Sequence, residues 1–259
     1  MKNLIKNTFI AGALLVGSSS AMATVVNVGG VIWDTDSVTS LVSGTQQDFS
    51  SAGNLLETSA TFDPINGITQ PFVQGWGIVS TLNSGAPNQA NFCPSCELTY
   101  QFTMELTSVT PTGLTSADFT FADLNIKFFV DSTPDFAGAT TFANAGADAG
   151  TQLFLELDAR GDLTGSGDNI GTGSDDGDGS VLLDVIGGIA MLNFDTNQEL
   201  GGTDMVLSSS FQPANDPANP GLLFGTFEAT GNTVAVPEPS SIALLGLGLL
   251  GFGATRKRK

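Results

Sequence analysis

Residues 97–106 read ELTYQFTMEL, and in this stretch every even position is apolar while every odd position is polar. Successive side chains of a strand point to opposite faces, so a period of two predicts a strand with one face in the core and one in water. Such strands are typical of antiparallel sheets, which commonly have one face packed on the core and the other exposed to solvent. This stretch therefore predicts an all-β fold.

Similar short runs of β-branched and aromatic residues recur along the chain, and the gaps between them are rich in Gly, Ser, Asn, Asp and Pro. Many short strands between such turns predict an antiparallel β-sandwich or jelly roll. No stretch of this region has the pattern of a long amphipathic helix. The further strands are expected at Val25–Trp33, Gly77–Leu82, Phe119–Val130, Gln152–Leu157, Val181–Phe194, Met205–Phe211 and Leu222–Thr230.

The N-terminus has the three-part order of a secretory signal. Lys2 and Lys6 precede an apolar run, and the segment ends in small residues at Ala21 and Ala23. The apolar run, residues 9–16, is far shorter than the ~20 residues that a membrane-spanning helix needs. We therefore expect residues 1–23 to be a signal peptide that is removed after Ala23.

Residues 236–259, VPEPSSIALLGLGLLGFGATRKRK, contain a second apolar run. As a helix, residues 240–255 would rise ~24 Å, against a hydrocarbon core of ~30 Å, so they predict a single short transmembrane helix of marginal stability. A buried helix of the body is the alternative, but the run has no polar face. The large apolar residues are Ile242, Leu244, Leu245, Leu247, Leu249, Leu250 and Phe252.

Four basic residues, Arg256, Lys257, Arg258 and Lys259, follow the apolar run. Moving each across a membrane would cost about 2.5 to 3.5 kcal/mol, so the four together cost several times what the apolar residues return. The bases therefore act as a stop and keep the C-terminus in the cytoplasm, with the body outside. Because proline fixes φ and lacks an amide hydrogen, Pro237-Glu238-Pro239 should form a rigid, extended stem before the helix.

The stem, the glycine-containing apolar helix and the basic cluster together resemble the PEP-CTERM sorting signal of Gram-negative bacteria that make exopolysaccharide. The resemblance implies that residues 237–259 are a sorting signal and that an exosortase reads Pro237, Glu238 and Pro239 at the inner membrane. It also implies cleavage near this stem and transfer to the cell surface or the extracellular matrix. The expected organisation is a signal peptide (1–23), an exported β-sandwich domain (24–229), a linker (230–236) and the sorting signal (237–259).

The exported region is strongly acidic. Residues 24–235 hold 25 acidic residues against two basic ones, Lys127 and Arg160, which gives a net charge of −23. Such a field repels phosphate backbones, so nucleic-acid binding is excluded. Divalent cations and basic or neutral molecules remain as partners, and plain solubility is the alternative purpose of the charge.

Cys93 and Cys96 are the two cysteines of the chain. In an oxidising compartment their spacing predicts a small local disulfide next to the strand that begins at Glu97. Free thiols and a redox or metal site are alternatives. The chain has no histidine, so a zinc site would lack two ligands, and the cations that would activate a thiol are not nearby.

Residues 158–180 are rich in aspartate and glycine. Two readings stay open: a solvated flexible loop, or a calcium-binding loop, since calcium takes six to eight oxygen ligands. The candidate ligands are Asp168, Asp175, Asp176 and Asp178. The start at Asp176 has the spacing of an EF-hand loop, but the twelfth residue from there is Gly187 and not the bidentate glutamate.

Without histidine the common Ser-His-Asp and Cys-His mechanisms are excluded, whereas a pair of carboxylates of the glycosidase kind is not. The leading interpretation is an exported, non-enzymatic protein of the cell surface or extracellular matrix, associated with exopolysaccharide and biofilm. A calcium-dependent carbohydrate-binding or adhesive module is the first alternative, and a glycoside hydrolase is the second. No cofactor is expected other than calcium.

Overall fold

The structure is a computed structural model of the chain. It describes residues 25–35, 47–56, 62–63, 67–68, 72–82, 89–136, 142–146, 150–170, 172, 174–213 and 222–236. The predicted signal peptide and residues 237–259 lie outside the described residues. Within the described ranges, no helix combines the length and the apolar character that a membrane crossing requires.

Strands dominate the described residues, and all of their pairings are antiparallel. The predicted all-β antiparallel class is therefore confirmed. The elements are β1 (Val25–Val28), β2 (Val31–Asp34), β3 (Gln47–Leu56), β4 (Phe62–Asp63), β5 (Gly67–Ile68), β6 (Phe72–Ile78), β7 (Thr81–Leu82), α2 (Gln89–Phe92), β8 (Glu97–Pro111), β9 (Ala117–Asp131), η2 (Phe142–Ala145), β10 (Gln152–Ala159), β11 (Leu163–Asp168), β12 (Asp176–Gly187), α3 (Met191–Phe194), η3 (Leu200–Gly202), β13 (Met205–Pro213) and β14 (Leu222–Gly231).

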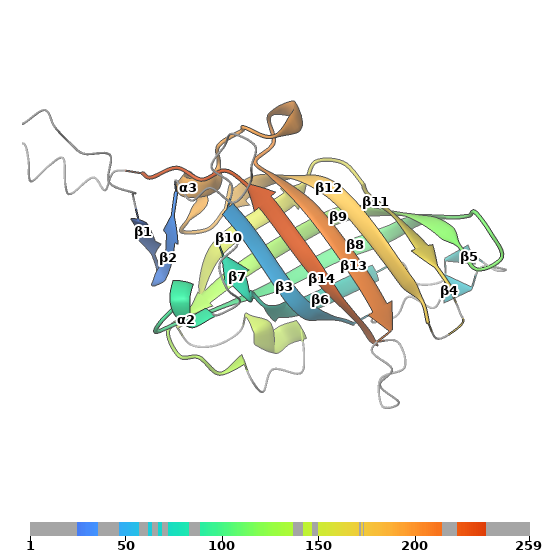
Figure 1. Cartoon of the computed structure of the whole chain (residues 1–259), viewed down its shortest axis with the longest axis horizontal. Helices are drawn as coiled ribbons and strands as arrows, with labels where there is room; N and C mark the ends of the chain where they lie inside the picture. The colour runs from blue at the N-terminus through green and yellow to red at the C-terminus, as the bar shows by residue number, and fades with distance from the viewer. Residues whose placement is uncertain are drawn as a thin grey trace, which may run out of the picture.

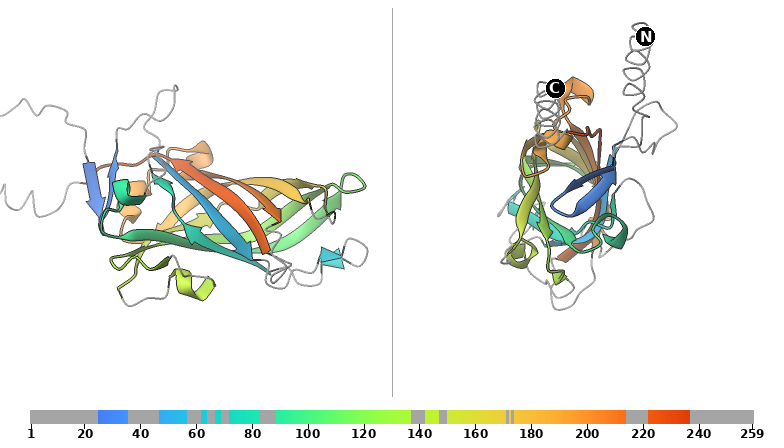
Figure 2. Two further views of the ribbon diagram at one scale, coloured as in Figure 1. Left: turned by 60° about the horizontal axis from the view of Figure 1, so that its bottom comes forward. Right: turned by 90° about the vertical axis from the view of Figure 1, so that its left-hand side faces the viewer.

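Ten strands form one continuous sheet that closes on itself. The order β9-β8-β6-β3-β14-β13-β12 runs around the molecule, and β10 and β11 both lie between β12 and β9, one at each end. Figure 1 shows the strands crossing the molecule obliquely, and the end-on view in Figure 2 shows them surrounding one interior. The two halves of the sheet thus face each other across a single core, as the layers of a sandwich do.

The core follows from the alternation of side chains along each strand. On β12, Val181, Leu183 and Val185 are buried, and the residues between them are more exposed. On β8, Leu98 and Tyr100 are buried as predicted, but Glu97 and Thr99 on the other face are buried as well. Tyr100 meets Phe227 of β14 across the interior, with ring centroids 4.5 Å apart. Contacts of this kind join the two halves of the sheet.

One end of the closed sheet is capped. The β1–β2 hairpin lies there, together with α2 and α3 (Figures 1 and 2). Trp33 of this hairpin is buried, with its ring centroid 5.3 Å from that of Phe194 and 6.1 Å from that of Phe154. Its indole Nε1–H donates to the Thr233 hydroxyl at 3.2 Å. The cap therefore connects the first described hairpin to the last described residues of the chain.

The structure differs from the predicted strands at several places. Residues 25–33 form two strands, because Gly29 and Gly30 adopt φ values of +62° and +95° and make a tight turn. The expected strand 181–194 ends at Gly187 and continues into a turn and α3. Strand β3 was not predicted at all.

The interpretation of residues 158–180 as a flexible loop is wrong. Most of this stretch belongs to β10, β11 and β12. In β11 and β12 glycines pair across the strands, Gly165 with Gly179 and Gly167 with Gly177. The ring of Phe119 lies where a side chain at Gly167 would point, so an aromatic neighbour fills the space that glycine leaves.

Residues 230–236, expected to be a linker, are packed on the body in this structure. Gly231 still pairs with Met205, and Thr233 is buried. The Val234 amide donates to the Asn193 carbonyl at 2.8 Å. These contacts hold the chain against α3 as far as Val234.

Candidate functional site

A hollow of about 400 Å³ lies over strands β11 to β14. We call it the strand groove. It lies far from the β1–β2 hairpin, at the other end of the closed sheet (Figure 1). Its lining residues are Ser166, Gly167, Asp168, Asp176, Gly177, Asp178, Ser210, Phe211, Gln212, Phe224, Gly225 and Thr226.

The register of the strands places the polar side chains of the strand groove on the outer face. Asp178 lies opposite Ser166 on one side and Ser210 on the other, and Ser210 lies opposite Thr226. These four residues are all exposed, whereas the glycines between them face inward. One row of hydroxyls and a carboxylate thus crosses four neighbouring strands.

A second row runs beside the first. Asp168 pairs with Asp176, and Gln212 pairs with Phe224. Phe224 keeps 38% of its surface exposed, so part of its ring is open to a ligand. The strand groove therefore combines hydrogen-bonding groups with one open apolar ring.

Glycines form the floor of the strand groove. A Cβ atom at Gly177 would lie 2.4 Å from the Phe211 ring and 2.7 Å from the Ser166 carbonyl oxygen, and one at Gly225 would lie 2.2 Å from the Ser210 carbonyl oxygen. Any larger residue at these positions would push the strands apart. The close approach of backbones is thus a fixed property of this part of the sheet.

Three of the four predicted calcium ligands line the strand groove. Asp168, Asp176 and Asp178 each accept a hydrogen bond through Oδ1, from Ser116 at 2.6 Å, from Asn169 at 3.2 Å and from Ser166 at 2.9 Å. Asp175 directly precedes β12 and is not part of the lining. Calcium binding by these residues stays a prediction.

The structure brings other carboxylates closer together at the capped end. One oxygen each of Glu97, Asp131 and Asp135 lie within 4.8 Å of one another. Glu97 and Asp131 are cross-strand partners at one end of the β8–β9 pair, and both are buried. Calcium prefers oxygen ligands of this kind, so this carboxylate triad is a second place that could hold the ion.

Burial raises the pKa of the Glu97 carboxyl above its ordinary value. The carboxylates of Asp135 and Asp131 raise this pKa further, whereas hydrogen bonds from the Phe136 and Asp135 amides act in the opposite direction. Sequence reasoning missed the triad because residues 97 and 131 meet only through the strand register. Glu97 occupies a polar position of the alternating stretch 97–106, so the sequence alone carries no signal of its burial.

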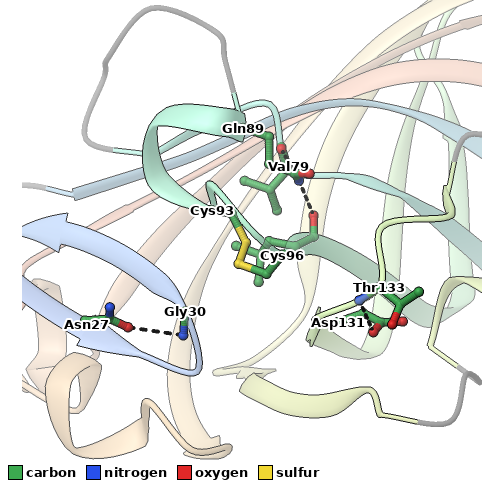
Figure 3. Close-up of a disulfide and its surroundings, with 9 residues drawn as sticks. Asn27, Gly30, Val79, Gln89, Cys93, Cys96, Asp131 and Thr133 are labelled. Atoms are coloured by element: carbon green, nitrogen blue, oxygen red, sulfur yellow. Dashed lines mark hydrogen bonds between the residues drawn. A yellow bond between two sulfur atoms is a disulfide. The ribbon is translucent and has the colours of Figure 1, made fainter.

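Cys93 and Cys96 form a disulfide, and both residues are buried. Figure 3 shows the bond between the end of α2 and the start of β8, with Gly30 of the hairpin turn on one side. The Gln89 side-chain amide donates to the carbonyls of Val79 and Leu98. The disulfide thus lies within a braced turn at the start of β8, and in this structure neither sulfur is a free thiol.

The two basic residues of the body lie outside the strand groove. Lys127 forms an ion pair with Glu156 at 3.4 Å, and Arg160 forms one with Asp184 at 3.6 Å. All four side chains are on the surface or partly exposed. The lining of the strand groove consequently carries carboxylates but no cation.

The comparison with known families gives one match. A family model described as the PEP-CTERM protein-sorting motif matches residues 235–259. No curated protein and no solved structure matches this chain. The predicted resemblance of the C-terminus is therefore confirmed. The chain carries a PEP-CTERM sorting motif at its C-terminus, which marks an exported protein with an exosortase as its processing partner.

Proposed function

We propose that the body is a non-enzymatic component of the cell surface or extracellular matrix, and that it contacts neutral exopolysaccharide in a biofilm after exosortase sorting. The sorting motif at residues 235–259 is the observation that carries the proposal, because it directs an otherwise unmatched body to the exterior. The strand groove supplies a surface for the contact.

The chemistry of the strand groove suits a neutral sugar. Carboxylate, amide and hydroxyl groups exchange hydrogen bonds with sugar hydroxyls, and a charged acceptor makes these bonds stronger. The open ring of Phe224 can pack against the apolar face of a sugar. A net charge of −23 on residues 24–235 disfavours acidic polysaccharides.

Cell fractionation tests the sorting and matrix steps. We expect the protein in the matrix or surface fraction of wild-type cells and in the membrane fraction when the exosortase is deleted. Deleting exopolysaccharide synthesis should release the protein into the medium. Equal retention with and without exopolysaccharide would contradict the proposed contact while leaving the sorting step intact.

A matched pair of phenylalanine variants tests the strand groove. Phe224→Ala should weaken binding to the purified exopolysaccharide about tenfold, as expected for one lost ring contact of about 1.4 kcal/mol. Phe72→Ala is the control, because Phe72 is also an exposed ring on this sheet, at 47%, but lies outside the groove. Affinity electrophoresis in gels containing the polysaccharide measures both. The same loss for both variants would argue against the groove.

The carboxylate triad favours a second candidate, a calcium-dependent carbohydrate-binding or adhesive module. Calcium that binds only the folded protein raises its melting temperature by mass action. We expect that rise to disappear in Asp131→Asn if the triad holds the ion, and in Asp178→Asn if the strand groove does. No thermal shift at millimolar calcium would remove this candidate.

A glycoside hydrolase is the remaining alternative, since the strand groove contains three carboxylates. It requires two of them to act as acid and as base or nucleophile. Incubating the protein with the purified exopolysaccharide and measuring new reducing ends distinguishes it from a binding module. We expect no new reducing ends.

A further inference from the structure

Exposed apolar side chains occur on the segments that contact the last described stretch of the chain. Ile186, Ile189, Leu192, Leu200, Val234 and Val236 are all exposed, Leu192 at 67% and Leu200 at 77%. We call these six residues the apolar rim. They belong to the segment from the end of β12 through α3 to η3, and to the stretch after β14. Of these, α3 lies at the capped end of the sheet (Figure 1).

Hydrogen bonds fix the departing chain between two parts of the apolar rim. Asn193 of α3 receives the Val234 amide at 2.8 Å through its carbonyl, and its side chain donates to the Val234 carbonyl at 2.9 Å. The Asn232 side chain donates to Glu199, next to Leu200, at 3.2 Å. These contacts fix the last described stretch of the chain next to the exposed residues Leu192 and Leu200.

The sequence that follows limits how far this end can be from a membrane. Five residues, 237–241, separate Val236 from the apolar run that begins at Ile242. Fully extended, the six Cα–Cα steps from Val236 to Ile242 span at most about 22 Å. If the sorting motif is held in the membrane, the capped end must lie within that distance of the lipid surface.

We propose that the apolar rim rests on the outer surface of the membrane while the tail is anchored, with the lipid interface as its partner. This inference rests on the proposed sorting step. The rim offers leucine, isoleucine and valine to the interface, where burial of apolar surface is favourable. The close tether keeps the rim there at a high effective concentration, so even weak contacts are populated.

Charge indicates which lipids the rim prefers. Asp195 and Glu199 lie between the rim residues Leu192 and Leu200 in the sequence, and the body as a whole is strongly acidic. An anionic lipid surface would repel them, whereas a zwitterionic surface would not. The rim should therefore contact phosphatidylcholine vesicles more closely than vesicles rich in phosphatidylglycerol.

Fluorescence quenching in vesicles tests the orientation. The full-length protein is reconstituted in phosphatidylcholine vesicles that contain brominated lipid, with tryptophan introduced as Leu192→Trp or, as the control, Leu114→Trp. Leu114 is also fully exposed but lies in the β8–β9 turn at the far end of the molecule (Figure 1). The two native tryptophans are buried, so each variant is compared with the wild type.

We expect the added fluorescence of Leu192→Trp to be quenched by about half or more, and that of Leu114→Trp to be unchanged. Leu200→Trp serves as a second rim variant if Leu192→Trp changes the melting temperature. Quenching no greater at the rim than at position 114 overturns the proposal, whether or not the chain stays on the vesicles. That result would not contradict the sorting step, which the cell fractionation experiment tests separately.

Discussion

The two ends of the closed sheet are built from different residues. At the capped end, the ring of Trp33 from the β1–β2 hairpin packs against the rings of Phe154 and Phe194. At the other end, β11 and β12 carry glycines on their inner face, and single rings such as Phe119 lie over them. The capped end thus contains a dense aromatic core, and the glycine-rich end contains closely spaced backbones.

This difference suggests that the two ends have different roles in stability and in ligand contact. Large buried rings contribute most to folding stability, because each removes a large apolar area from water. Glycine contributes no such area, but it lets strands approach closely and leaves the outer face lined by short polar side chains. We therefore expect stability to depend mainly on the capped end, and ligand contact to depend on the strand groove.

The largest effect should come from removing a ring at the capped end. Phe154 is fully buried, and its ring packs against those of Trp33 and Phe194 with centroid distances of 6.1 Å to each. Phe154→Ala should lower the free energy of unfolding by about 3–5 kcal/mol. Phe224→Ala should change it by less than about 0.5 kcal/mol, because that ring is exposed. Urea denaturation measures both changes. Similar losses of unfolding free energy in the two variants would contradict the expectation that stability depends mainly on the capped end.

A smaller effect is expected from filling space at the glycine-rich end. Gly177→Ala forces a Cβ atom against the Phe211 ring and the Ser166 carbonyl, so it should cost about 1–3 kcal/mol. Gly113→Ala is the matched control, because its Cβ atom would meet its nearest neighbour at an ordinary 3.5 Å. If Gly177→Ala were as well tolerated as the control in the same urea assay, the close strand packing would be refuted.

The disulfide should contribute about 2 kcal/mol, because it closes a loop with a sequence separation of only three residues. Reduction, or the double change Cys93→Ala/Cys96→Ala, should lower the melting temperature without abolishing the fold. Calorimetry with and without reductant measures the change. Complete unfolding on reduction would show that the start of β8 depends on the disulfide far more than the loop length predicts.

The smallest effect concerns the pH dependence of Glu97 at the capped end. Its pKa is raised by burial, so between its ordinary and raised values the folded protein binds more protons than the unfolded protein. This group therefore stabilises the fold most at low pH, and its contribution falls as pH rises through that window. The difference in unfolding free energy between wild type and Glu97→Gln, measured in chelator, should shift in favour of wild type on acidification. A shift in the opposite direction would contradict the raised pKa.

The sequence predicted the fold class well where strands carry large side chains. The alternation in residues 97–106 predicted β8 where it lies, but not that its first four residues are all buried. The Thr99 hydroxyl donates to the Ala145 carbonyl of η2 at 2.6 Å, so the polar face is covered at this end. The sorting motif at the C-terminus was also predicted correctly. Its prolines, apolar run and basic residues follow one another in the sequence, so no contact between distant residues is needed to identify it.

The glycine-rich end was not predicted, for a physical reason. In Asp176-Gly177-Asp178-Gly179-Ser180 glycine occupies the inward positions where a strand usually has a large apolar residue. The residues alternate as in a strand, but the alternation of apolar and polar side chains that predicts a strand is missing. The strand groove and the carboxylate triad depend on register between strands that are distant in sequence. Asp168, Asp176 and Asp178 were singled out for their composition, but their neighbours Ser210 and Phe224 were not.

Mass spectrometry of the mature protein from its own cells tests the central claim most directly. Export and sorting through the C-terminal motif predict an N-terminus at Thr24 and a C-terminus near Pro237, with the protein recovered outside the cytoplasm. An intact chain from Met1 to Lys259, recovered from the cytoplasmic fraction, would contradict the account.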